Sequence, residues 1–143
     1  MRSIPVILFG LCLLSFACES STSPGRGFLY EVISFSDLPT QAMADSTFYS
    51  FSGNSSLLWS SDSTVVDKRI DSILTAVRSK GIVLKQAWYQ PASSSCGMLT
   101  YAPPAILVVR LNSSDSRIRN LSFSDGLANF HNCPGMRYRK YIF

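Results

Sequence analysis

One apolar stripe between Thr64 and Lys80 constrains the fold of this 143-residue chain more than any other part of its sequence. Apolar side chains recur there at helical spacing, at Val66, Ile70, Ile73, Leu74 and Val77. On an α-helix these positions share one face, which is the pattern of a helix that packs against a sheet. The sequence therefore predicts one main amphipathic helix over about residues 64–80.

Signals at both ends of this segment agree with the predicted helix. Thr64 followed by Asp67 resembles a capping box, in which two side chains satisfy free backbone N–H groups at a helix start. Arg78 and Lys80 place positive charge near the negative end of the helix dipole. Gly81 tolerates the left-handed conformation that often follows a helix. The start, the apolar face and the end are therefore mutually consistent.

Three segments give strong strand signals. Residues 28–35 and 82–89 are rich in aromatic and β-branched side chains and are bounded by turn-forming residues. Residues 105–111, AILVVRL, form the most continuous apolar run after the leader, which favours a central strand.

Other segments give weaker signals. Residues 47–51 and 57–59 fit either short strands or an ordered loop, and residues 117–123 alternate imperfectly as a partner strand. The C-terminal segment 135–143 alternates Arg, Tyr and Lys, which suits an edge strand. With one helix between strands and hairpin-like spacing afterwards, we expect residues 28–143 to form a single α+β domain, a mostly antiparallel sheet packed by the helix.

The start of the chain has the composition of an export signal. Arg2 supplies positive charge, residues 4–14 are apolar, and residues 15–17 place small side chains where a signal peptidase cleaves. The apolar run is shorter than the ~20 residues that span a membrane as a helix. The sequence therefore predicts a signal peptide over residues 1–17 and export of the remaining chain.

Residues 14–18, LSFAC, resemble the end of a bacterial lipoprotein signal, where a small-residue box precedes a cysteine that is diacylated and becomes the N-terminus. The resemblance implies that Cys18 is lipidated and holds the protein at a membrane. Residues 19–27 are rich in Ser, Pro and Gly and are expected to form a solvated tether. The alternative is ordinary cleavage after Ala17, which would leave a soluble periplasmic or secreted protein.

The cysteine count favours lipidation. Removal of the leader discards Cys12 and leaves an odd number of cysteines in an oxidising compartment. Acylation of Cys18 would leave Cys96 and Cys133 as one pair. A disulfide between them would close about 38 residues and stabilise the domain by roughly 4 kcal/mol in the chain-entropy model.

The same region also offers a catalytic alternative. Cys96 would be the nucleophile, His131 its base, and Asp125 or Asn129 the residue that orients the base. A serine with His131 is a second version, although the chain has no Gly-x-Ser-x-Gly motif. Because oxidising conditions and Cys133 favour a bridge, we expect no catalytic residues and keep a small envelope hydrolase as the alternative.

Charge and residue clusters predict neither nucleic-acid binding nor a metal or cofactor site. The net charge of +4 becomes +3 without Arg2, and no basic run of five or more occurs. Asp67 and Asp71 are four residues apart on the predicted helix. We expect them to form a solvated, dipole-compatible face rather than an acid–base pair.

The predicted C-terminal edge strand suggests a binding role. An edge strand offers backbone groups with which a partner protein can pair, so we expect a partner to bind there through Arg137, Arg139 and Tyr141. The sequence as a whole predicts a lipid-anchored bacterial cell-envelope protein, in the periplasm or at the outer membrane or cell surface. Its expected role is binding, assembly or structural support.

Overall fold

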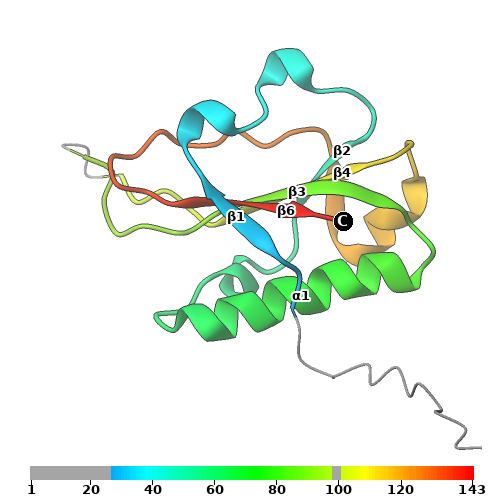
Figure 1. Cartoon of the computed structure of the whole chain (residues 1–143), viewed down its shortest axis with the longest axis horizontal. Helices are drawn as coiled ribbons and strands as arrows, with labels where there is room; N and C mark the ends of the chain where they lie inside the picture. Colours follow the sequence, from blue (N-terminus) through cyan, green and yellow to red (C-terminus); the bar gives the residue numbers. More distant parts are fainter. Residues whose placement is uncertain (1–26, 98–100) are drawn as a thin grey trace, which may run out of the picture.

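The fold is taken from a computed structural model, which describes residues 27–97 and 101–143. Its centre is a six-stranded antiparallel sheet in the order β1-β6-β3-β4-β2-β5. The elements are β1 (Tyr30–Ile33), β2 (Phe48–Phe51), α1 (Ser63–Ser79), β3 (Leu84–Gln90), β4 (Ile106–Leu111), β5 (Phe123–Asp125) and β6 (Tyr138–Ile142). Helix α1 lies along one face of the sheet (Figure 1). The predicted α+β class, with a mostly antiparallel sheet and one main helix, is confirmed.

Helix α1 matches the predicted amphipathic segment but differs at its start. Its buried stripe consists of Val66, Ile70, Leu74 and Val77. The capping residue is Asp62, whose carboxylate accepts the backbone N–H of Thr64 at 2.9 Å. The predicted capping box of Thr64 and Asp67 is therefore wrong, because Asp62 already caps the helix two residues earlier. Gly81 follows the helix with a φ of +71°, as predicted.

The strong strand predictions are confirmed, and the weaker ones are confirmed in part. β1, β3 and β4 form in the three segments with strong signals, and β4 lies inside the sheet between β3 and β2. Phe48–Phe51 forms β2, whereas Ser55–Leu58 is a 3₁₀ helix and not a strand.

The segment predicted as a strand over residues 117–123 is mostly a 3₁₀ helix, Ser116–Leu121. Asp115 caps this helix by accepting a backbone N–H of its first turn at 3.0 Å. Ile118 and Leu121 are three residues apart and share one side of a 3₁₀ helix, which explains their poor alternation as a strand. Only the residues that follow form β5, which pairs with β2 and not with β4.

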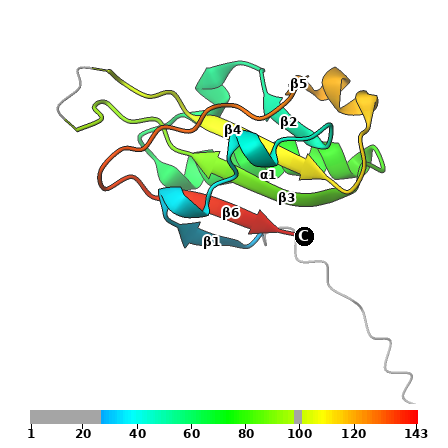
Figure 2. The same cartoon turned by 90° about the horizontal axis from the view of Figure 1, so that it is seen from above.

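The C-terminal strand is not an edge strand, so that prediction is wrong. β6 pairs with β1 on one side and with β3 on the other (Figure 2). Its side chains explain this position, because Tyr138 and Tyr141 are both 1% exposed and belong to the cores on opposite faces of the sheet. Since both sides of β6 are paired, a partner cannot add a strand to it.

Each face of the sheet carries a hydrophobic core. The larger core lies between the sheet and α1. The opposite face, which we call the outer face, has a second core of Leu38, Phe48, Trp88, Val108 and Tyr138. The chain between β5 and β6 crosses this face and covers part of it (Figure 1). Because β4 is buried on both faces, its sequence is an almost continuous apolar run.

Two buried tyrosines on the helix side allow a matched test of one tertiary hydrogen bond. The Tyr89 hydroxyl donates to the Leu58 carbonyl at 2.8 Å, whereas the Tyr141 hydroxyl lies beside Arg139 without a hydrogen bond of regular geometry. Burial raises the pKa of each hydroxyl to about 12, so both stay protonated at neutral pH. We expect Tyr89→Phe to lower the free energy of unfolding by about 1 kcal/mol, and Tyr141→Phe to lower it by less. Urea unfolding would check this, and equal losses in the two variants would contradict it.

Candidate functional site

A groove of about 540 Å³ lies on the outer face, between the sheet and the chain that links β1 to β2. Its floor consists of Phe48 of β2, Gln86 and Trp88 of β3, Arg110 of β4, and Lys140 of β6. We call this site the outer-face groove. The antiparallel register brings its residues together, because Arg110 is paired with Phe48 on one side and Gln86 on the other, and Trp88 with Lys140. The volume is within the range typical of small-molecule sites.

Two aromatic rings form the apolar part of the floor. Phe48 and Trp88 are stacked, with ring centres 5.8 Å apart and planes 20° apart. The guanidinium carbon of Arg110 lies 5.0 Å from the centre of the Phe48 ring, which is a cation–π contact. The aromatic floor therefore also orients one of the two cations.

The two cations of the groove are each paired with an acid. Arg110 Nη2 lies 3.3 Å from Asp45 Oδ2, and Lys140 Nζ lies 3.2 Å from Glu31 Oε1. Hydrogen bonds from Thr47 lower the pKa of the Asp45 carboxyl, so it is ionised at neutral pH. The cationic side chains are 32% and 27% exposed, and the acidic ones are 47% and 50% exposed. The positive charges are therefore the more buried members of both pairs.

One polar group in the groove lining lacks a partner. Trp88 is only 5% exposed, and its indole Nε1–H has no acceptor among the residues described. A buried donor without an acceptor costs about 1–3 kcal/mol, so such groups in native proteins call for an explanation. Because this N–H is itself inaccessible, it is not offered to the open groove, whose donors are the two cations and the Gln86 amide.

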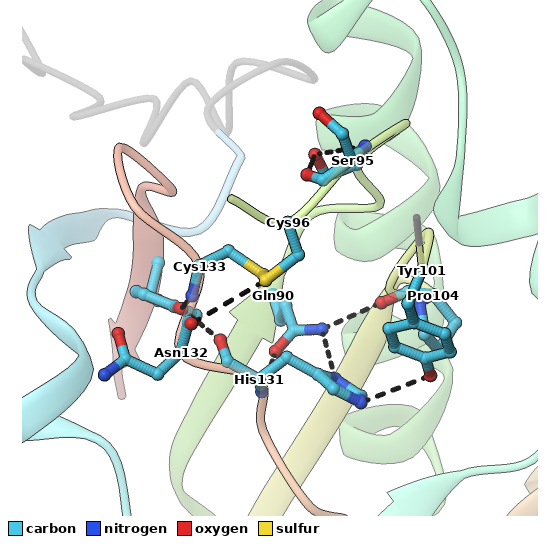
Figure 3. The surroundings of a disulfide bond; sticks show 10 residues. Gln90, Ser95, Cys96, Tyr101, Pro104, His131, Asn132 and Cys133 are labelled. Carbon is cyan, nitrogen blue, oxygen red and sulfur yellow. Dashed lines mark hydrogen bonds between the residues drawn. A yellow bond between two sulfur atoms is a disulfide. The ribbon is translucent and has the colours of Figure 1, made fainter. Parts of the chain in front are cut away.

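The predicted disulfide between Cys96 and Cys133 is confirmed (Figure 3). The two Cα atoms are 4.9 Å apart, which is within the range for a disulfide. Cys96 is therefore no thiol in this structure, and it cannot act as a nucleophile while the bridge is formed.

A hydrogen-bond network near this bridge holds His131 (Figure 3). The His131 backbone N–H donates to Gln90 Oε1 at 2.7 Å, and Gln90 Nε2 donates to the Pro104 carbonyl at 2.9 Å. These two bonds fix the orientation of the amide, so Gln90 Nε2 must also be the donor to His131 Nδ1, 3.1 Å away. The ring proton is then on Nε2, which faces the Tyr101 hydroxyl at 3.3 Å. In this tautomer the ring has no free lone pair with which it could accept a proton from a nucleophile.

The residues predicted to orient His131 in the hydrolase alternative are engaged elsewhere. Asp125 pairs with Arg119 at 2.6 Å, and Asn129 accepts a hydrogen bond from Gln41 at 2.9 Å. The described residues therefore do not bring a nucleophile, a free base and an orienting group together.

The residues predicted to bind a partner do not form one exposed surface. Arg137 is exposed and precedes β6, whereas Tyr141 is buried on the helix side of the sheet. The side chain of Arg139 is 16% exposed and donates to the Asp67 carboxylate of α1. The side chains of Arg139 and Tyr141 therefore lie between β6 and α1, where they contact other parts of the fold.

The helix carboxylates also differ from the prediction of a solvated face. Asp67 pairs with Arg139, and Asp71 accepts the backbone N–H of Phe28 at 2.9 Å. Both join the helix to the first or last segment of the described chain. Sequence spacing identified their shared face, but it did not identify their partners.

Several predictions concern residues outside the described ranges. The signal peptide, Cys18 and the tether up to residue 26 all belong to residues 1–26, so lipidation remains a prediction. In the ranges that the structure describes, no helix has the length and apolar character needed to cross a membrane. Those ranges also contain no cluster of three His, Cys, Asp or Glu side chains suited to a metal ion.

Sequence reasoning missed the outer-face groove. Its residues come from four strands and have no shared linear motif. One signal was present, because Arg110 interrupts the apolar run predicted to be the central strand. A charge in such a strand requires a partner or a function, since burying an unpaired charge is costly.

Comparison with known proteins finds no match to any protein-family model, to any curated protein or to any solved structure.

Proposed function

We propose that this chain is a lipid-anchored bacterial cell-envelope protein whose domain binds a ligand or partner at the outer-face groove. The leader and Cys18 support export and anchoring. The observation that carries the binding role is the groove floor, where the stacked rings of Phe48 and Trp88 lie with the cations Arg110 and Lys140 in one hollow.

Binding is favoured over catalysis by the state of Cys96 and His131, the residues that the hydrolase alternative names. Cys96 is oxidised to a disulfide, and the ring nitrogens of His131 are engaged by Gln90 and Tyr101. Among the described residues that line the groove there is no histidine or cysteine, and the hydroxyl of its serine, Ser36, is hydrogen-bonded to Ser34 at 2.8 Å. The donors and rings of the groove are groups that hold a molecule in place.

Site-specific crosslinking in intact cells tests this proposal. A photoreactive amino acid replaces Gln86, which lines the groove, and in a matched variant replaces Thr75, which is exposed on α1. We expect irradiation to give an adduct of defined added mass at position 86 and none at position 75. The same preparation should contain, in its membrane fraction, an N-terminal peptide that starts at Cys18 and carries a diacylglyceryl mass.

The two parts of the proposal can fail separately. No adduct at position 86, or the same products from both positions, would contradict binding at the groove. A mature N-terminus without the added mass would contradict the lipid anchor and favour a soluble exported protein.

A further inference from the structure

We infer that the outer-face groove binds a small amphipathic carboxylic acid. Its carboxylate would contact Arg110 and Lys140, and its apolar part would lie on Phe48 and Trp88. This inference rests on the proposed binding function and specifies the ligand chemistry of the same site.

The two cations lie deeper in the molecule than the acids with which they pair. Arg110 and Lys140 stand on inner strands and line the groove, whereas their acidic partners are more exposed and lie outside the lining. The lining holds one carboxylate, Asp37, which accepts hydrogen bonds from Ser34, so positive charge is in excess there. Ion pairs with such exposed acids contribute little to stability, so a ligand can replace or join them at low cost. A carboxylate would form charge-assisted hydrogen bonds with both side chains.

The aromatic floor and its surroundings suit the apolar part of such a ligand. Phe48 and Trp88 present stacked rings, and Leu38 and Met43 line the side of the groove. Met43 is 63% exposed and unbranched, so it can adapt its shape to an apolar ligand.

The dimensions of the groove favour a small molecule over a folded protein. Its volume of about 540 Å³ is that of a small-ligand site. A stable protein interface buries roughly 800 Å² on each partner, over a much broader surface. A protein-sized adduct in the crosslinking experiment would therefore count against this inference.

Displacement of a fluorescent probe tests the ligand class. The chain from residue 18 onward, with Cys18→Ala and its disulfide formed, is incubated with 8-anilinonaphthalene-1-sulfonate, an aromatic anion. Octanoate and 1-octanol, which have the same chain length, then compete for the site. We expect octanoate to displace the probe at a concentration at least tenfold lower than 1-octanol, because only octanoate has a charge to pair with the cations.

Substitutions assign this preference to the groove. Arg110→Gln and Lys140→Gln should each lower the affinity for octanoate about tenfold, since each removes one charge-assisted contact. The affinity for 1-octanol should stay unchanged. Arg78→Gln is the matched control, because Arg78 is an exposed cation of α1 that also contacts a ring, that of Phe28 at 5.6 Å. It should leave both affinities unchanged.

The outcomes separate this inference from the proposed function. Equal displacement by octanoate and 1-octanol, or groove variants that behave like Arg78→Gln, would overturn the acidic ligand. If position 86 still forms its adduct in cells, the binding function stands and only the ligand class is wrong. If octanoate binds as expected but position 86 gives no adduct, the groove chemistry stands and the cellular binding role fails.

Discussion

Replacement of Cys96 and Cys133 together by serine should lower the free energy of unfolding by about 4 kcal/mol. The disulfide joins residues separated by 37 positions, so its loss frees a long loop in the unfolded chain. In the chain-entropy model, this added freedom favours the unfolded state. Urea unfolding at neutral pH, with the wild-type disulfide intact, measures the difference directly.

A chemical control accompanies this double substitution. Wild-type protein reduced with dithiothreitol should unfold at nearly the same urea concentration as the double variant, because both lack the bridge. Ser46→Ala changes an exposed serine outside the segment that the bridge closes, and it should shift the free energy of unfolding by less than about 0.5 kcal/mol. A loss below about 1 kcal/mol in the double variant would show that the bridge adds little to stability.

The parts of the fold that sequence could predict are those set by local spacing. The stripe from Val66 to Val77 repeats within one helix, and the apolar run of β4 is continuous. The pairing of Cys96 with Cys133 followed from cysteine parity rather than from geometry. Each of these signals lies within one short segment or in the number of cysteines. The predictions drawn from them therefore did not depend on the order of the strands.

The order of the strands could not be predicted in the same way. β6 alternates Arg and Lys with Tyr, and that pattern is compatible with an exposed edge. In the structure, β1 returns from the other end of the chain and pairs with its free side. Pairing between segments more than 100 residues apart leaves no periodic signal in either segment, and therefore an inner strand was mistaken for an edge.

The outer-face groove was unpredictable for a related reason. Arg110, Gln86 and Phe48 are distant in sequence and become neighbours through the registers of two strand pairs. A change of register by one residue would send each side chain to the opposite face. The site therefore depends on tertiary pairing, which sequence periodicity does not specify.

The second large effect is expected at Arg139, where Arg139→Ala should lower the free energy of unfolding by about 3 kcal/mol. Its guanidinium donates to Asp67 on α1 and lies 4.5 Å from the centre of the Tyr30 ring and 5.4 Å from that of Tyr89. Loss of a charge-assisted hydrogen bond accounts for about 1.5–3 kcal/mol, and each cation–π contact for about 0.5–1 kcal/mol. Arg139 therefore joins β6 to α1, β1 and β3 at one point.

Two further variants distinguish this structural role from the partner-binding role that the sequence suggested. Arg139→Lys keeps the charge but lacks the planar donor group. Its free energy of unfolding should therefore lie between those of Arg139→Ala and the wild type. Arg137→Ala removes an exposed cation two residues earlier and should change the free energy of unfolding by less than about 0.5 kcal/mol. If Arg139 acted only on a partner, its alanine variant would unfold like the Arg137 variant, because a side chain that contacts only a partner adds nothing to the isolated fold. Urea unfolding of the three variants thus decides between the two roles.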